Sequence, residues 1–137
     1  MRLFVPYLAT STNVGTRQHW TKRKREVDSC HLLVRHVVKR DGIKPIGGCV
    51  DLVFRPRLGK GVRRRDTSNY SLNVKHLEDG LVAAGLLPDD RGEYVRRVIM
   101  EPPEVDRQAE TGTWIEIIPV QNEQQNITGD ITEVTNG

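Results

Sequence analysis

The chain has 137 residues and a mass of 15.6 kDa, which is enough for one compact domain and too little for two. Hydrophobic residues make up 36% and charged residues 28% of the sequence, so fibrous and wholly disordered proteins are excluded. The longest apolar run, residues 81–87, is far shorter than the roughly 20 residues of a membrane-spanning helix. The apolar part of residues 1–6 is also too short for a secretory signal, so we expect an intracellular, cytoplasmic protein.

Charge is unevenly distributed along the chain. Residues 1–75 contain 17 of the 21 lysines and arginines but 5 of the 18 acidic residues, a surplus of 12 positive charges. Residues 76–137 contain the other 4 basic residues and 13 acidic residues, a surplus of 9 negative charges. This asymmetry indicates a polyanionic partner for the basic half. The alternative is that the two halves fold against each other and neutralise locally.

The first half of the chain alternates between strand and helix patterns. Residues 1–7 predict a strand that ends near Pro6, and residues 9–18 predict a turn-rich polar loop. Apolar residues at three- and four-residue spacing then predict an amphipathic helix over residues 21–39. The apolar stripe consists of Val27, Cys30, Val34, Val37 and Val38. Residues 49–56 are β-branched and alternate, which predicts a second strand.

A second helix is predicted after a Gly-rich basic loop at residues 58–65. Its buried face steps by three and four residues, and comprises Tyr70, Val74, Leu77, Leu81 and Ala84. Thr67 or Ser68 is the expected N-cap, and Gly85 is the expected C-terminal stop. Gly80 inside this helix costs about 1 kcal/mol relative to Ala, a cost that a close approach by another backbone would justify.

Two final strands complete the predicted domain. Residues 94–100 and 113–118 carry strand patterns, and a charged loop that contains proline joins them. The predicted order is β-α-β-α-β-β. We therefore expect a single α/β (α+β) domain over residues 1–120, with a small mixed sheet and two helices, that forms a homodimer. Residues 121–137 are polar and lack periodicity, so we expect a disordered tail.

The two cysteines indicate a reducing compartment rather than a disulfide framework. Together with His31 and His36, Cys30 and Cys49 have no recognised zinc spacing. Both cysteines lie among apolar neighbours in the sequence, and we predict that both are small core residues.

Basic and acidic residues converge around the second predicted helix. The basic run at residues 63–65 is followed at once by Asp66, and Asp89-Asp90 come directly after the end of the helix. Carboxylate oxygens are ligands that Mg²⁺ prefers, and the ion keeps positions for water and for substrate phosphate. The pattern is compatible with a metal site beside a bound phosphate, and also with ordinary surface salt bridges.

Distance limits how these acids can meet. A straight helix would keep Asp66 and Asp90 about 25 Å apart, because each residue adds about 1.5 Å along the axis. A return over residues 86–90 spans at most about 18 Å. Three arrangements stay open: a shorter helix, a loop that doubles back fully, or a metal site completed across a dimer.

Lys75 lies on the helix face away from the predicted buried stripe, with Asp79 four residues later. One interpretation is a helical ion pair that contributes about 0.3–0.5 kcal/mol. The other is a phosphate ligand that stabilises charge developing on a pentacovalent phosphorus. Asn69 either caps the helix or orients a carboxylate.

The ordered motifs over residues 63–90 resemble the RusA-type Holliday junction resolvases, especially those of phages and prophages. Members of that family show a basic run, Asp-x-Asp-Asn, a lysine, a helix end of the form Asp-(Gly/Ala)-Leu-x-x-Ala-Gly, and an Asp-Asp pair. The matching residues here are Arg63-Arg64-Arg65-Asp66-Thr67-Ser68-Asn69, Lys75, and the run from Leu77 through Asp79-Gly80-Leu81 and Ala84-Gly85 to Asp89-Asp90. Asn13 and His19-Trp20 also resemble the start of the family, so the resemblance covers roughly residues 1–120.

The resemblance implies a Mg²⁺-dependent endonuclease, with Mn²⁺ as an alternative ion, that acts as a homodimer on four-way DNA junctions. It implies paired nicks that leave 5′-phosphate and 3′-hydroxyl ends. By position, Asp66 and Asp90 would be metal-binding carboxylates and Lys75 the catalytic lysine, with Asp89 as a neighbouring acid that helps to bind the metal. Neither a small-molecule cofactor nor a membrane partner is implied.

The chain departs from the family pattern at one acid. Ser68 stands where the second acid of Asp-x-Asp-Asn is expected, and a serine hydroxyl is a weaker, neutral metal ligand. Asp79 is a candidate substitute for the missing charge. The spacing from Asp66 to Lys75 is also longer than in the shortest family members, by about one helical turn.

DNA phosphates are expected to contact the basic loop and the start of the first helix. The candidate residues are Lys22, Arg23, Lys24, Arg25, Lys60, Arg63, Arg64, Arg65 and Asn69. Such contacts give salt-dependent affinity without base reading. Trp20 and Tyr70 are predicted to be core or scaffold residues, with stacking at the junction centre as the alternative.

Two further classes of protein stay open. The first is a non-catalytic protein that binds DNA junctions through the same basic surface, in which Ser68 has dismantled the metal site. The second is a basic protein that binds RNA or the ribosome, which would explain the charge but not the Asp-Asp pair.

Overall fold

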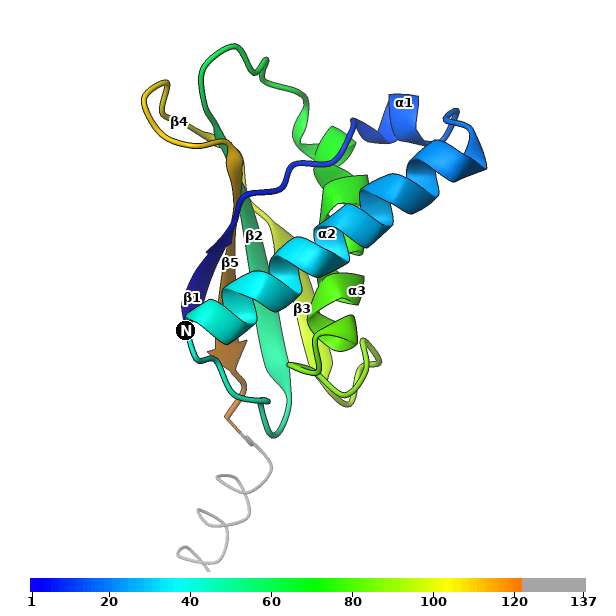
Figure 1. Ribbon diagram of the computed structural model, residues 1–137. Helices are drawn as coiled ribbons and strands as arrows, with labels where there is room; N and C mark the ends of the chain where they lie inside the picture. The colour runs from blue at the N-terminus through cyan, green and yellow to red at the C-terminus, as the bar shows by residue number, and fades with distance from the viewer. Residues whose placement is uncertain (122–137) are drawn as a thin grey trace, which may run out of the picture.

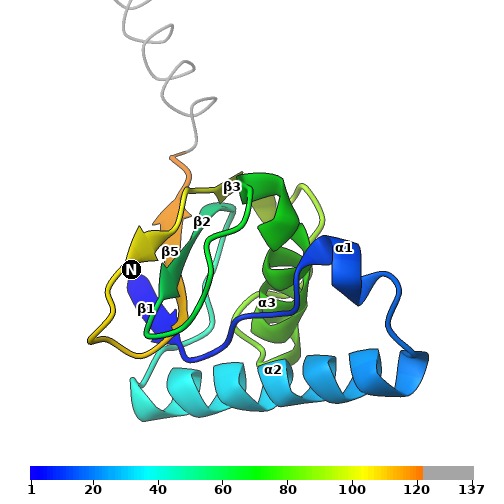
Figure 2. The same cartoon turned by 90° about the horizontal axis from the view of Figure 1, so that it is seen from above.

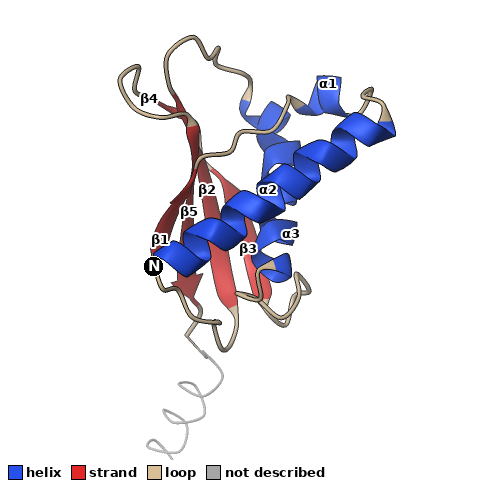
Figure 3. Ribbon diagram, in the orientation of Figure 1, coloured by secondary structure: helices blue, strands red, loops and turns tan. Residues whose placement is uncertain are grey.

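Two long helices cover one face of a mixed β-sheet in the computed structural model, which describes residues 1–121 (Figures 1 and 2). The helices are α1 (Thr12–Gly15), α2 (Trp20–Arg40) and α3 (Ser71–Ala83), and a 3₁₀ turn, η1 (Thr67–Tyr70), precedes α3. The strands are β1 (Arg2–Val5), β2 (Val50–Leu58), β3 (Val95–Met100), β4 (Glu104–Val105) and β5 (Gly112–Pro119). The predicted α+β class with a small mixed sheet is confirmed (Figure 3). From residue 122 onward, the predicted tail lies outside the described residues.

The sheet combines parallel and antiparallel pairs. Its strand order is β1-β5-β2-β3, and β4 pairs with the far end of β2. Strand β5 is antiparallel to both of its neighbours, whereas β2 and β3 are parallel. A parallel pair needs a crossover connection, and α3 supplies it.

Alternation along the strands decides which face the helices cover. In β5, Thr113, Ile115 and Ile117 are buried, whereas the alternate residues Glu116 and Ile118 are exposed. Because successive side chains of a strand point to opposite faces, one face of β5 joins the core beneath α2 and α3. The stripe predicted for the first helix does the same, since Cys30, Val34 and Val37 are fully buried.

The two cysteines differ in burial. Cys30 lies in the core, as predicted, and burial raises the pKa of its thiol to about 12, with the Asp79 and Glu26 charges as further causes. A thiol with such a pKa is almost never the reactive thiolate at neutral pH. The prediction for Cys49 is wrong, because it is only half-buried just before β2, where its Sγ lies 3.8 Å from the Gly92 carbonyl oxygen.

Helix α3 begins later than predicted and takes its cap from another element. Within residues 1–121, neither Thr67 nor Ser68 caps α3 with its side chain; instead these residues form the 3₁₀ turn. The Leu72 backbone N–H donates to Thr12 Oγ1 at 3.1 Å, so a residue of α1 satisfies one of the free donors at the start of α3. The sequence interval expected to be a loop, residues 9–18, thus contains a short helix that organises α3.

The end of α3 follows the prediction. Gly85 has φ of +77°, the left-handed conformation that glycine adopts at low cost. The Leu86 N–H donates to the Leu81 carbonyl at 3.0 Å and the Gly85 N–H donates to the Val82 carbonyl at 2.9 Å, which is the Schellman pattern. Leu86 and Leu87 are then buried in the core, so the chain turns back immediately after the helix.

Gly80 lies where α3 approaches α2. A Cβ atom there would be 3.0 Å from Val34 Cγ2, so the residue facing Gly80 is a side chain of α2 rather than a backbone. We expect Gly80→Ala to change the free energy of unfolding by less than about 1 kcal/mol, because the gain in helix propensity and the crowding oppose each other. In a Val34→Ala background the same substitution should stabilise by about 1 kcal/mol, measured by urea unfolding. An identical effect in both backgrounds would show that Val34 does not set the crossing distance.

Candidate functional site

Lys75 and Asp79 lie on the outward face of α3, one helical turn apart. Lys75 Nζ is 3.2 Å from Asp79 Oδ1, and the two side chains are 59% and 40% exposed. The hydrogen bond and charge of Asp79, followed by the charge of Asp90, raise the pKa of Lys75. The ammonium group is therefore charged at neutral pH and accessible from solvent.

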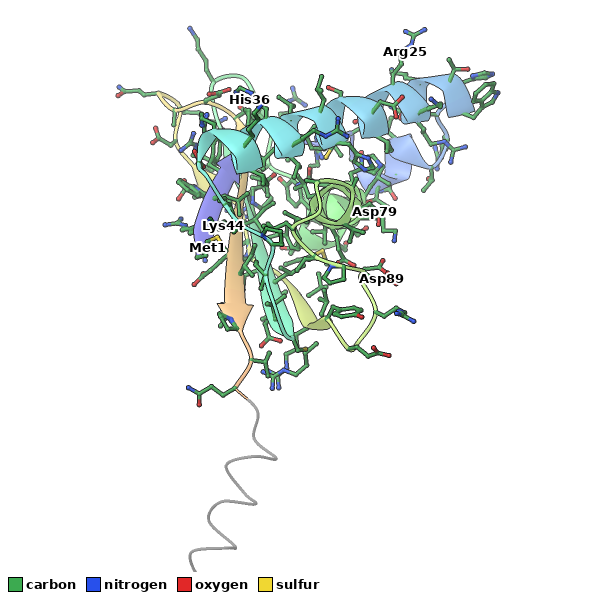
Figure 4. The ribbon with its side chains drawn as sticks, turned by 60° about the horizontal axis from the view of Figure 1, so that its bottom comes forward. Met1, Arg25, His36, Lys44, Asp79 and Asp89 are labelled. Atoms are coloured by element: carbon green, nitrogen blue, oxygen red, sulfur yellow. The ribbon has the colours of Figure 1, made fainter. Side chains whose placement is uncertain are left out.

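The loop after α3 brings Asp90 to the same lysine. Asp90 Oδ2 lies 3.5 Å from Lys75 Nζ, although Lys75 precedes the end of α3 by eight residues. That offset corresponds to about 12 Å along the helix axis, so the loop returns beside α3. Figure 4 shows Asp79 on the helix next to the loop that carries Asp89. The loop after α3 thus doubles back, which brings Asp90 to Lys75 but does not by itself bring it to Asp66.

A third acid lies close to this group. Burial, and then the charge of Asp90, raise the pKa of Glu78, while Lys75 acts in the opposite direction. Lys75 contacts Asp79 and Asp90, and Glu78 lies three residues after it on the same helix. We call these four residues the Lys75 cluster.

Asp89 has a different role from Asp90. Its Oδ1 accepts a hydrogen bond from the Asp90 N–H at 2.7 Å, and its Oδ2 pairs with Arg91 Nε at 2.9 Å. The hydrogen bond from Asp90 is the main cause that lowers the pKa of Asp89. Asp89 therefore shapes the turn, and it leaves the Asp90 carboxylate directed at Lys75.

Asp66 lies at the start of η1, and its side chain is exposed. Four residues of 3₁₀ helix and the first five residues of α3 lead from it to Lys75, a rise of about 15 Å along the axis. Within residues 1–121, no ion pair joins Asp66 to Lys75. The structure therefore brings Lys75 together with Asp90 and does not add Asp66 to the pair.

Ser68 and Asn69 follow Asp66 in η1. The Ser68 side chain is exposed, whereas Asn69 is half-buried and its carbonyl oxygen lies 3.2 Å from Thr12 Oγ1. Among the described residues 1–121, no three His, Cys, Asp or Glu side chains form a group that could hold a metal ion. Carboxylates are suitable ligands for Mg²⁺ in chemical type, so the predicted metal ligands stay a prediction.

The predicted DNA-binding residues fall on two exposed segments. Lys22, Arg23, Lys24 and Arg25 occupy the first turns of α2, and Lys60, Arg63 and Arg64 lie in the loop between β2 and η1; all seven are exposed. Arg65 differs, because its Nη1 donates to the Ala9 carbonyl at 2.8 Å and its guanidinium lies 5.3 Å from the centre of the Tyr70 ring. Arg65 therefore holds the loop against the domain and is half-buried.

The predictions for the aromatic residues Tyr70 and Trp20 have different outcomes. Tyr70 is buried, as expected of a scaffold residue, and its hydroxyl accepts from the Arg65 N–H at 3.0 Å. The prediction that Trp20 is a core residue is wrong, since its side chain is 65% exposed. Trp20 lies seven residues before Val27 and so continues the apolar stripe. However, the first turns of α2 extend past the sheet, where this face of the helix meets solvent (Figures 1 and 2).

A buried polar layer lies behind the Lys75 cluster, on the inner side of α3. The Tyr7 hydroxyl lies 2.7 Å from His76 Nδ1, and burial lowers the pKa of His76 and raises that of Tyr7. Both shifts favour a neutral imidazole and a neutral phenol, which share one hydrogen bond. Asn73, three residues before His76 on the inner face of the helix, bonds to Ala9 and to Thr113. These contacts fix the position of α3, and the sequence patterns did not predict them.

Comparison with known proteins adds no relative: no protein-family model matches this chain, and no curated sequence matches it significantly. Across residues 1–121, no helix is both long enough and apolar enough to cross a membrane.

Proposed function

We propose that the protein is a Mg²⁺-dependent endonuclease that cleaves four-way DNA junctions, as the RusA-type resolvases do. The observation that carries the proposal is the return of Asp90 to Lys75 over the outward face of α3. Residues from two segments that the resemblance assigns to one active site thereby meet at the surface. The exposed cations of α2 and of the loop before η1 supply the affinity for a polyanion.

Lys75 is the residue that contacts the scissile phosphate in this proposal. Its ion pairs with Asp79 and Asp90 are solvent-exposed, and such pairs contribute roughly 0–1 kcal/mol. The ammonium group can therefore leave them for a phosphate oxygen at little cost. A positive charge at that oxygen stabilises the transition state more than the ground state, because negative charge accumulates there during attack.

Asp90 and Asp66 would hold the metal ion. Asp79 is the candidate third carboxylate, because Ser68 stands where the family pattern has an acid. Bound Mg²⁺ would neutralise charge on the phosphate and lower the pKa of a water molecule. Because Asp66 does not join the Lys75 cluster of its own chain, we propose that the homodimer completes the site with Asp66 of one subunit and Asp90 of the other. Cleavage would take place in the cytoplasm of a bacterium or of a phage-infected cell.

The binding-only alternative is favoured by one observation. Ser68 is exposed at the position of the expected second acid and contributes no charge to a metal site. A protein of this kind would keep the basic surface and bind junctions without cutting them.

A junction-cleavage assay separates the two functions. The full chain is incubated with a synthetic four-way junction in Mg²⁺, in Mn²⁺ and in EDTA. We expect paired nicks with 5′-phosphate ends in either metal and intact DNA in EDTA, because the carboxylates act only through the ion. The metal is raised to about 10 mM, on the order of ten times the concentration that a weak site requires. If the protein shifts the junction in a gel but produces no nicks at this concentration of either metal, the nuclease is rejected in favour of the binding-only protein.

A further inference from the structure

Trp20 is the first residue of α2, and its indole is 65% exposed. The His19 ring lies beside it, with 5.7 Å between ring centroids and a tilt of 33°. The second tryptophan is arranged differently: Trp114 is half-buried, its ring packs 5.1 Å from that of Phe4, and its Nε1 donates to Glu104 Oε1 at 3.2 Å. A large, rigid ring left in solvent is typical of a recognition site, where tryptophan is among the residues that contribute most.

Basic residues surround this ring without acidic neighbours in the sequence. Residues 17–25 contain Arg17, Lys22, Arg23, Lys24 and Arg25 and no acid, and all five side chains are exposed. The first turn of α2 has no acidic residue, although the helix dipole favours acids there. Figure 4 shows Arg25 pointing away from the body of the protein. Lys24 pairs with Asp28 Oδ2 at 3.2 Å, one turn further along α2, whereas Lys22 and Arg23 in the first turn oppose the helix dipole and are suited to an anionic partner.

The tip of α2 is firmly held. Glu26 Oε1 accepts from the Thr10 N–H at 2.6 Å and from its hydroxyl at 2.9 Å, and Gln18 Nε2 donates to the same hydroxyl at 3.2 Å. The chain that leads into α2 is thus tied to its second turn. A ring carried on a fixed element loses little conformational freedom when it is covered, which favours tight binding.

Two kinds of anionic partner, a membrane surface and a nucleic acid, are compatible with cations at the tip of α2, and the apolar groups exposed there distinguish them. A membrane-surface helix needs an apolar face along its length, but Cys30, Val34 and Val37 of α2 are buried against the rest of the domain. What stays exposed at this end is one flat ring among cations. A nucleic acid matches that pattern, since each base offers a flat π-face and each nucleotide a phosphate.

We propose that Trp20 stacks on a base that is unstacked at the branch point of the DNA, while Lys22, Arg23 and Arg17 hold the adjacent phosphates. The inference rests on the proposed function, because a branch point is what distinguishes the substrate from linear duplex. Stacking of this kind is indifferent to sequence and selects for exposed bases. Trp20 is therefore a specificity residue for branched DNA and not a catalytic residue.

Fluorescence tests the proposal directly, because the chain has two tryptophans. In a Trp114→Phe protein, Trp20 is the remaining tryptophan and can be excited selectively over the three tyrosines. We expect its emission to be quenched on titration with a four-way junction in EDTA, and to change much less with a linear duplex of the same sequence. As a second readout that leaves the protein unaltered, 2-aminopurine at the branch point should change its emission when the wild-type protein binds.

Affinity provides the quantitative test. Trp20→Ala should weaken junction binding by about tenfold, within a range of roughly 5- to 100-fold, whereas Trp20→Phe should stay within about threefold of wild type. Leu32→Ala is the matched control, because Leu32 is also 65% exposed on α2 but lies three turns away from the cations at the tip. It should bind the junction as wild type does.

Three results would overturn the inference: wild-type junction affinity in Trp20→Ala, an equal loss for junction and duplex, or a Trp20 emission change produced by vesicles of equal phosphatidylglycerol and phosphatidylcholine but not by the junction. The last would identify a membrane-binding tip. The proposed nuclease fails separately. A wild-type protein that shows the Trp20 response but never cuts in Mg²⁺ keeps this inference and loses the nuclease.

Discussion

Replacing Asp90 by asparagine is expected to slow junction cleavage by a factor on the order of 10² to 10³, the usual effect of removing one group that stabilises a transition-state charge. Asparagine keeps the size of the side chain and removes the charge that faces Lys75 at 3.5 Å. Junction binding in EDTA should be no weaker than in the wild type, because the substitution removes a negative charge and leaves every basic residue in place.

Asp89→Asn is the matched control for this variant. Asp89 neighbours Asp90 in sequence, but its carboxylate is directed at the Asp90 N–H and at Arg91 rather than at Lys75. An amide oxygen can accept the same N–H bond, so the turn should persist and cleavage should fall by less than about tenfold. Equal losses for the two variants would mean that the loop as a whole, and not the Asp90 carboxylate, matters for cleavage.

Lys75→Met extends the same test. The substitution keeps an unbranched side chain on the exposed face of α3 and removes the ammonium group. We expect a similar loss of cleavage, and a double variant with Asp90→Asn should be barely slower than either single variant, since groups that act as a unit are strongly non-additive. Losses that multiply would instead indicate that Lys75 and Asp90 act independently.

The position of Asp66 is best tested by mixing subunits. Asp66→Asn and Asp90→Asn proteins should each be inactive alone. If Asp66 of one subunit meets Asp90 of the other, a heterodimer of the two has one intact site and one doubly impaired site. Mixtures should then nick junctions in one strand without resolving them. Activity that stays absent in verified heterodimers would place both acids in the same subunit's site, whereas cleavage by the Asp66→Asn protein alone would remove Asp66 from the site.

Helical periodicity predicts the inner faces of both long helices, because burial of an apolar stripe is decided locally. The stripe from Cys30 to Val37 and the face from Tyr70 to Leu81 both enter the core, whereas Val27, nearer the tip of α2, is only half-buried. The same rule fails for Trp20, which continues the stripe beyond the surface that α2 covers. Periodicity shows which side of a helix is apolar. How much of that side is covered depends on how far the rest of the domain extends along the helix, which only the tertiary structure decides.

The candidate site was predictable in composition and only partly in geometry. The resemblance names Lys75 and Asp90, but their meeting depends on Gly85 reversing the chain and on Leu86 and Leu87 anchoring the return in the core. Two adjacent leucines directly after a C-terminal glycine are a signal that could have indicated this return, but the sequence analysis did not use it. The delayed start of α3 had no local signal, since its cap is Thr12, about sixty residues earlier in the chain.

Asn73→Ala is expected to lower the free energy of unfolding by about 3 kcal/mol, the largest stability effect we foresee for a polar residue here. The Asn73 side chain is 1% exposed, and it joins three elements. Its Oδ1 accepts from the Ala9 N–H at 2.9 Å and its Nδ2 donates to Thr113 Oγ1 at 2.9 Å, while the Thr113 hydroxyl donates to the Tyr7 carbonyl at 2.9 Å. Truncation leaves the Ala9 donor unpaired in the interior and opens a cavity beside it.

Urea unfolding followed by circular dichroism measures the effect, and the melting temperature should fall by about 10 °C. Asn13→Ala is the matched control, because Asn13 is exposed on α1, and it should change stability by less than about 0.5 kcal/mol. Thr113→Val removes the shared hydroxyl while keeping its shape. In the double variant Asn73→Ala/Thr113→Val, the loss in free energy of unfolding should be smaller than the sum of the two single losses by about 1 kcal/mol. The reason is that both substitutions remove the same hydrogen bond.

The asparagine network also bears on the site, because Asn73 lies two residues before Lys75 on the same helix. The network ties α3 to the segment after β1 and to β5. It thereby fixes the position of α3, and with it the position of Lys75 relative to Asp90 on the loop after the helix. Well below its melting temperature, Asn73→Ala should therefore cut more slowly than wild type, whereas Asn13→Ala should not. If folded Asn73→Ala protein cuts at the wild-type rate, the buried network stabilises the domain without positioning Lys75, and the loop alone sets the contact between Lys75 and Asp90.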